Sequence, residues 1–120
     1  MLVVDGANVV GSRPSGWWRD RAGAAARLHR SIAGADLGFD EVLLVLEGLA
    51  RAGQPAGEHG VVRTIHAAGA GDDAIVDQVR SHSTRGDEVV VVTADRRLRE
   101  RVAAAGGSSV GPSWLLHRTG

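Results

Sequence analysis

The stretch Val42-Leu43-Leu44-Val45-Leu46 decides the expected fold class. It is apolar at every position instead of at alternate positions, which is typical of a strand whose two faces are both buried. Short apolar runs of the same kind occur at residues 2–4, 61–65 and 89–92, and a weaker one occurs at residues 108–110. Together these runs predict a sheet that is covered by helices on both faces.

Segments of helical composition alternate with these strands at residues 17–32, 72–83 and 95–105. Strands that alternate with helices favour β-α-β units and a parallel sheet. We therefore predict a three-layer α/β/α fold with a central, mainly parallel sheet of four to five strands. Residues 48–60 have no consistent period and predict a loop or a short irregular helix, and residues 112–117 predict one helical turn.

Length and composition limit the classes of protein. A chain of 120 residues, 43% hydrophobic and 23% charged, is expected to form one domain over residues 1–120. It contains no cysteine and no lysine, which excludes disulfides, thiolate metal sites, P-loop phosphate binding and Schiff-base chemistry. Its apolar runs are far shorter than the roughly 20 residues of a membrane helix. No leader pattern follows Met1, so we expect a cytoplasmic protein without membrane contact.

Acidic residues follow the predicted strands. Asp5 directly follows the first strand, Glu47 follows the second, and Asp95 lies just past the fourth, while Asp72 and Asp73 open the middle helix. Because the carboxyl ends of parallel strands share one edge of a sheet, we expect these carboxylates to lie together. Close carboxylates raise one another's pKa unless a cation compensates them. Oxygen ligands without cysteine or clustered histidine favour Mg²⁺ or Mn²⁺.

Helical geometry ranks the two adjacent acids of the middle helix. With about 100° per residue, Asp72 lies on the stripe that Ile75 and Val79 bury, so its side chain is expected to point toward the sheet edge. Asp73 lies one step further round the helix, and we rank it second. A simpler alternative applies to Asp72, Asp73 and Asp95 taken singly, because an aspartate at a helix start is more often an N-cap.

Three segments carry a family resemblance: Val3-Val4-Asp5-Gly6-Ala7-Asn8-Val9, Gly71-Asp72-Asp73-Ala74-Ile75-Val76 and Val91-Val92-Thr93-Ala94-Asp95. They resemble the signature segments of the NYN branch of the PIN-like nucleases, which have a Rossmann-like fold, and they occur in the expected order. The matching strand and helix pattern extends over nearly the whole chain. The resemblance implies an acidic cluster that binds divalent metal ions and hydrolyses RNA phosphodiester bonds.

By this resemblance the catalytic and metal-binding carboxylates are Asp5, Asp72, Asp73 and Asp95, and Glu47 is a further metal ligand. Some relatives carry another acid four residues after the last aspartate. This chain has Arg99 there, which leaves the presence of a second metal ion open.

Other side chains near the same edge are predicted to hold the RNA. The loop of residues 5–11 supplies Asn8, which can orient Asp5 or contact a phosphate. The arginines predicted to bind RNA are Arg13, Arg51, Arg96 and Arg97, whereas Arg99 and Arg101 are better explained as a solvated helix face. One of Trp17 and Trp18 is expected in the core, and the other is a candidate for stacking on a base.

Two other functions stay open from the sequence. The first is a PIN-like module that binds RNA or a nucleotide without cleaving it. Fourteen arginines balance fourteen acids, and this neutral charge mildly favours such a module because no basic field covers the molecule. The second is the toxin nuclease of a toxin–antitoxin pair, whose partner protein covers the site. Single-stranded or structured RNA is the expected partner, and a protein partner or a homodimer stays open.

Overall fold

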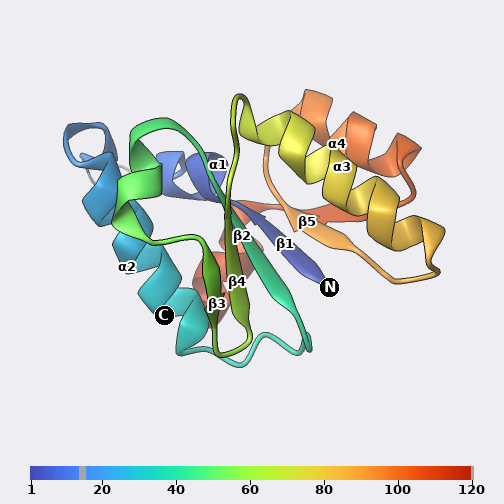
Figure 1. Cartoon of the computed structure of the whole chain (residues 1–120), viewed down its shortest axis with the longest axis horizontal. Helices are drawn as coiled ribbons and strands as arrows, with labels where there is room; N and C mark the ends of the chain where they lie inside the picture. The colour runs from blue at the N-terminus through green and yellow to red at the C-terminus, as the bar shows by residue number, and fades with distance from the viewer. Residues whose placement is uncertain (14–15, 120) are drawn as a thin grey trace.

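The computed structural model describes residues 1–13 and 16–119 and places a six-stranded sheet between two layers of helices (Figure 1). The strands are β1 (Leu2–Asp5), β2 (Val42–Leu46), β3 (Gly57–His59), β4 (Val62–His66), β5 (Val90–Val92) and β6 (Ser108–Val110). The helices are α1 (Gly6–Gly11), α2 (Arg21–Ala33), α3 (Gly71–Thr84), α4 (Arg96–Ala104) and α5 (Pro112–Thr119), together with the 3₁₀ helices η1 (Trp17–Arg19) and η2 (Gly48–Gly53). The predicted three-layer α/β/α class is confirmed, and the sheet has six strands instead of the predicted four to five. Within the described residues, no helix has the length and apolar character needed to cross a membrane.

The strand order is β3-β4-β2-β1-β5-β6, and every pair is parallel except β3 with β4. From β1 the chain moves outward through β2 to β4. Helix α3 then carries it back across the sheet, so that β5 pairs with the other side of β1. The strand order therefore changes direction at β1. In open parallel sheets, ligands bind at such a point, just beyond the carboxyl ends of the strands.

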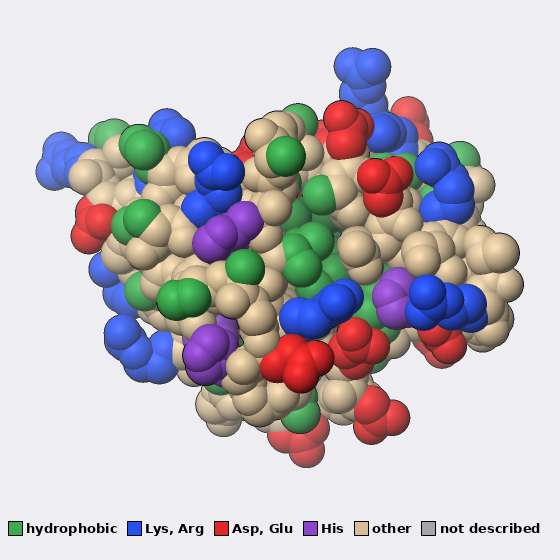
Figure 2. Space-filling view, in the orientation of Figure 1, with side chains coloured by type: hydrophobic (Ala, Val, Ile, Leu, Met, Phe, Trp, Pro, Cys, Tyr) green, Lys and Arg blue, Asp and Glu red, His purple; other side chains and the backbone are tan. Residues whose placement is uncertain are grey.

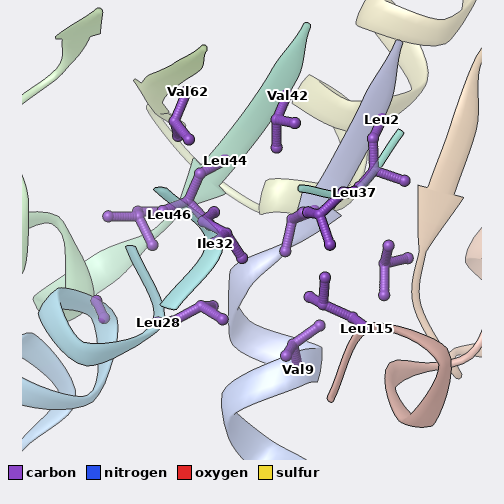
Figure 3. Packing of buried hydrophobic residues seen from close by; sticks show 13 residues of the cluster. Leu2, Val9, Leu28, Ile32, Leu37, Val42, Leu44, Leu46, Val62 and Leu115 are labelled. Atoms are coloured by element: carbon purple, nitrogen blue, oxygen red, sulfur yellow. The ribbon is translucent and has the colours of Figure 1, made fainter. Parts of the chain in front are cut away.

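The core consists of two apolar clusters, one on each face of the sheet. Alternate residues of one strand serve different clusters, because successive side chains of a strand point to opposite faces. Leu2 and Val4 pack with α1, α2 and α5, whereas Val3 packs with α3 and α4. In Figure 3, Val9 of α1 and Leu115 of α5 lie among the side chains of the first cluster. Burial on both faces explains why the strands are apolar at every position.

Residues 6–11, which the sequence predicts as a loop, form helix α1. Asp5 caps this helix, because its Oδ1 accepts a hydrogen bond from the backbone N–H of Asn8 at 3.4 Å. The glycines at both ends, Gly6 and Gly11, lower the intrinsic helix propensity of the segment. Its composition therefore does not predict a helix.

Three further differences from the predicted elements have local causes. The helix predicted over residues 17–32 is divided at Asp20, whose Oδ1 accepts from the N–H of Gly23 at 2.8 Å and so starts α2 anew. Strand β3 was not predicted, because all three of its side chains are exposed and it has no apolar signal. Helix α5 begins at Pro112 as predicted but has 8 residues instead of one turn.

Gly6 allows α1 to begin directly against β2. A Cβ atom at this position would lie 2.7 Å from the backbone oxygen of Val45 and 2.9 Å from Cδ2 of Leu46. Gly6→Ala is therefore expected to lower the free energy of unfolding by about 1–3 kcal/mol, as measured by urea denaturation. Gly69→Ala is the matched control, because no atom of the described residues lies within 4 Å of a Cβ there. Equal stability of the two variants would contradict the close approach of α1 to β2.

Candidate functional site

Asp5 lies at the end of β1, where the strand order changes direction, and is only 5% exposed. The hydroxyl of Thr93, just after β5, donates to its Oδ2 at 3.0 Å, and the N–H of Asn8 donates to its Oδ1. Burial raises the pKa of Asp5 to about 6 in spite of these two hydrogen bonds, and the charges of Asp72 and Glu47 raise it further. A carboxyl with this pKa holds its charge at an energetic cost at neutral pH.

Asn8 and Thr93 connect the segment after β1 to the segment after β5. The side-chain oxygen of Asn8 accepts from the N–H of Ala94 at 2.8 Å, and Oγ1 of Thr93 accepts from the N–H of Asp95 at 3.2 Å. The amide of Asn8 thus positions the loop that carries Asp95. The sequence pattern did not predict this role of Thr93, although its hydroxyl directly follows a buried strand.

Glu47 and Asp72 bring the start of α3 to the same edge. Oε2 of Glu47 accepts from the N–H of Gly71, the first residue of α3, at 3.2 Å. Burial raises the pKa of the neighbouring Asp72, and the charges of Asp95 and Glu47 add to this shift, while Arg101 opposes it. Figure 2 shows acidic side chains over α3. Carboxylates from four segments are therefore close enough at this edge for their charges to repel one another.

Asp73 and Asp95 have protein partners of their own. Asp73 is exposed and accepts from Nη2 of Arg101 at 2.9 Å, so its side chain lies on the flank of α3. Asp95 is exposed and caps α4, because its Oδ1 accepts from the N–H of Leu98 at 2.9 Å. The simple N-cap explanation thus holds for Asp95. It is wrong for the two acids of α3, whose N-cap residue is Ala70.

The predicted metal ligands do not form an assembled metal centre. Among residues 1–13 and 16–119, no three His, Cys, Asp or Glu side chains are grouped so that they could hold a metal ion. Their chemistry nevertheless fits a hard divalent cation. The buried Asp5 and the half-buried Asp72 have raised pKa values because of this burial and because they face further carboxylates. A cation bound by the carboxylate oxygens would offset this charge.

The structure separates two arginines that were predicted to bind RNA. Arg96 is exposed at the first position of α4, directly after Asp95, and so lies at the acidic edge. Arg13 lies just past the far end of α1, where it lines a cavity of about 290 Å³ together with Arg27 and Arg30.

The remaining arginines of this region differ in their contacts. Nε of Arg51 donates to the backbone oxygen of Gly48 at 3.1 Å, and Nε of Arg99 donates to Oγ of Ser109 at 2.9 Å. Arg97 is exposed on α4. Arg99 is exposed, which agrees with its expected place on a solvated face of α4.

Comparison with known proteins identifies a solved structure with a similar fold. No protein-family model matches the chain, and no curated protein matches it. The crystal structure of a mutant of Rae1 (YacP) from Bacillus subtilis matches with a TM-score of 0.74 and 18% sequence identity, over 97% of this chain and 72% of that one. The two chains share one fold. The likeness to Rae1 extends over nearly the whole chain described here, and at this identity it concerns the fold alone.

Thr93 offers a direct test of how the structure sets the charge of Asp5. Thr93→Val removes the hydroxyl that donates to the Asp5 carboxylate, so the pKa of Asp5 is expected to rise above its value of about 6. Thr93→Ser keeps the donor and is expected to leave the pKa close to that of the wild type. An NMR titration of the Asp5 carboxyl carbon measures both. An unchanged pKa in Thr93→Val would show that this hydrogen bond does not control Asp5.

Proposed function

We propose that this protein is a metal-dependent ribonuclease of the NYN branch of the PIN-like nucleases and that it hydrolyses RNA phosphodiester bonds at the carboxyl edge of its sheet. The observation that carries the proposal is the buried Asp5 at the reversal of strand order, with Asp72 and Glu47 close enough to raise its pKa. The fold shared with Rae1 and the three signature-like segments support it.

The proposed cofactor is Mg²⁺ or Mn²⁺, held by Asp5, Asp72 and Asp95 with Glu47 as a further ligand. When bound, such an ion supplies positive charge for the phosphate and lowers the pKa of a coordinated water.

The protein itself supplies position and charge. The hydroxyl of Thr93 and the backbone N–H of Asn8 orient the carboxylate of Asp5, and the backbone N–H of Gly71 donates to Glu47. Burial of Asp5 in a region of low dielectric strengthens its interaction with any cation that enters. Arg96, exposed beside the edge, is placed to bind a backbone phosphate of the RNA.

The experiment that tests this function is cleavage of labelled single-stranded and structured RNAs. Each RNA is incubated with the protein in Mg²⁺, in Mn²⁺ and in EDTA. Cleavage with either metal and its loss in EDTA are the expected results. Absence of cleavage for every RNA in both metals would contradict a nuclease.

The two adjacent acids of α3 are expected to differ in importance. Asp72→Asn removes a half-buried charge that acts on the acidic edge, so it is expected to slow cleavage by about tenfold or more. Asp73→Asn removes an exposed partner of Arg101 and is expected to change the rate by less than about twofold. Rates measured at saturating metal compare the two variants directly. A larger loss of cleavage rate in Asp73→Asn than in Asp72→Asn would contradict the greater importance of Asp72.

One observation favours a second candidate, a module that binds RNA without cleaving it: no three metal-ligating side chains of the described residues are grouped as a preformed site. Such a module is expected to bind RNA without turnover in the same assay.

A further inference from the structure

A pocket of about 240 Å³ opens beside the acidic edge: Glu47 belongs to both, and Gly6 of the pocket lining directly follows Asp5. Its walls include Trp17 of η1 and Arg21 of α2. We propose that this pocket binds one nucleobase of an RNA strand, next to the phosphodiester group that lies at the edge around Asp5. The identity of the ligand as RNA rests on the proposed function.

The walls of the pocket have the chemistry of a base-stacking site. The guanidinium carbon of Arg21 lies 5.5 Å from the centroid of the Trp17 ring, and both side chains line the cavity. Single-stranded bases stack on aromatic rings and on guanidinium planes in proteins that bind RNA. Leu46 and Ala25, both buried, supply an apolar surface beneath them. A volume below that of pockets for drug-sized ligands suits one small planar group.

The charge of Glu47 disfavours a phosphate group inside the pocket. The carboxylate of Glu47 lies on its lining, where it repels a phosphate group. An uncharged base can enter an apolar cavity without this repulsion and without the cost of removing a phosphate from water. The base is therefore expected inside the pocket and the backbone outside it.

Small residues keep the pocket open and hold the Trp17 ring in place. A Cβ at Gly11 would already lie 3.5 Å from the Trp17 ring, so the end of α1 packs directly on the indole. Gly53 of η2 approaches the backbone of Ala22 in α2 so closely that a Cβ there would collide with its carbonyl oxygen. This contact fixes η2, which carries Ala50 on the pocket lining, against α2.

The chain contains a matched control for the pair of Trp17 and Arg21. Arg19 lies over the ring of Trp18 in the same manner, at 5.7 Å from its centroid. Trp18 is 54% exposed and is not part of the pocket lining. If any exposed tryptophan bound RNA non-specifically, Trp17 and Trp18 would contribute equally to RNA affinity. A base pocket requires a contribution from Trp17 alone.

The test measures binding of a fluorescein-labelled single-stranded RNA hexamer to the Asp5→Asn protein, so that cleavage does not interfere. Trp17→Leu and Ala50→Leu, which respectively remove the stacking ring and fill the cavity, are expected to weaken binding about tenfold. The controls Trp18→Leu and Ala52→Leu are expected to change it by less than about twofold. Ala50→Leu keeps the indole and so covers the case in which Trp17→Leu does not fold. A thermal melt by circular dichroism verifies each variant.

Results for the pocket and for the nuclease can be told apart. Binding that depends on Trp17 in a protein whose wild type cuts no RNA would support the pocket and contradict the nuclease. Cleavage by the wild type with equal hexamer affinity for Trp17→Leu, Ala50→Leu and both controls would overturn the pocket and keep the nuclease. Absence of any hexamer binding by the Asp5→Asn parent would also overturn the pocket.

Discussion

Asp5→Asn is expected to abolish metal-dependent RNA cleavage, with a fall in kcat/KM of about a hundredfold or more. The amide is close to the carboxylate in size, and its oxygen can still accept the hydrogen bond from Thr93. It carries no negative charge, so it binds a divalent cation far more weakly. A hundredfold fall in kcat/KM corresponds to a loss of about 2.7 kcal/mol in stabilisation of the transition state.

The control for this experiment is Asp77→Asn on the outer face of α3. Asp77 lies 3.8 Å from Arg80, and both side chains are well exposed, so this substitution is expected to leave cleavage unchanged. Both variants must keep the far-ultraviolet circular dichroism of the wild type. An Asp5→Asn protein that cleaves as fast as the wild type would show that the reaction does not take place at this edge.

The same substitution is expected to make the protein more stable at neutral pH in metal-free buffer. The carboxyl of Asp5 has a pKa of 3.8 as a free group and about 6 in the folded protein. Between these values the unfolded chain has released its proton and the folded chain has not, so the free energy of unfolding falls as the pH rises. The loss is complete above a pH of about 6 and amounts to about 3 kcal/mol. The amide that replaces this carboxyl in Asp5→Asn does not titrate, so the free energy of unfolding of the variant does not fall in this way.

Thermal melts of the two proteins in EDTA measure the difference. The melting temperatures are expected to be similar near pH 4 and to differ by about 10 °C near pH 7, with Asp5→Asn the higher. Addition of Mn²⁺ at neutral pH is expected to raise the melting temperature of the wild type and to have little effect on the variant. Parallel curves over the whole pH range would contradict a raised pKa of Asp5.

The buried strands were predictable because an uninterrupted run of apolar residues is by itself typical of a strand buried on both faces. Every side chain of β2 is buried, three on one face of the sheet and two on the other, so each position has to be apolar. Strand β3 gave no such signal, because its residues pair with β4 through backbone groups alone and expose their side chains. Helix α1 was missed because a cap and a tight contact with β2, rather than propensity, stabilise it.

The carboxyl edge was predictable for the same reason, since an acid after a buried strand must lie where parallel strands end. The period of α3 also predicted that Asp72 lies inward, as the structure places it. Asp73, which was predicted as a further metal ligand, instead lies exposed on the flank of α3 and pairs with Arg101. The placement of Asn8 on the loop before Asp95 and of Thr93 on Asp5 could not be predicted, because each contact joins segments more than eighty residues apart.

The sequence by itself therefore determined the α/β class, the parallel strands and the set of acids at their ends, because each depends on the order of polar and apolar residues along one short segment. Only the tertiary structure decided which acid is buried, how Glu47 reaches the first residue of α3, and that Trp17 lines a pocket beside the edge while Trp18 does not. The first two features depend on how the segments after β1, β2 and β5 meet one another and the start of α3, and the third depends on the packing of α1, α2 and η2. Close packing of this kind is set by side chains from distant parts of the chain. No periodic pattern in the sequence indicates it.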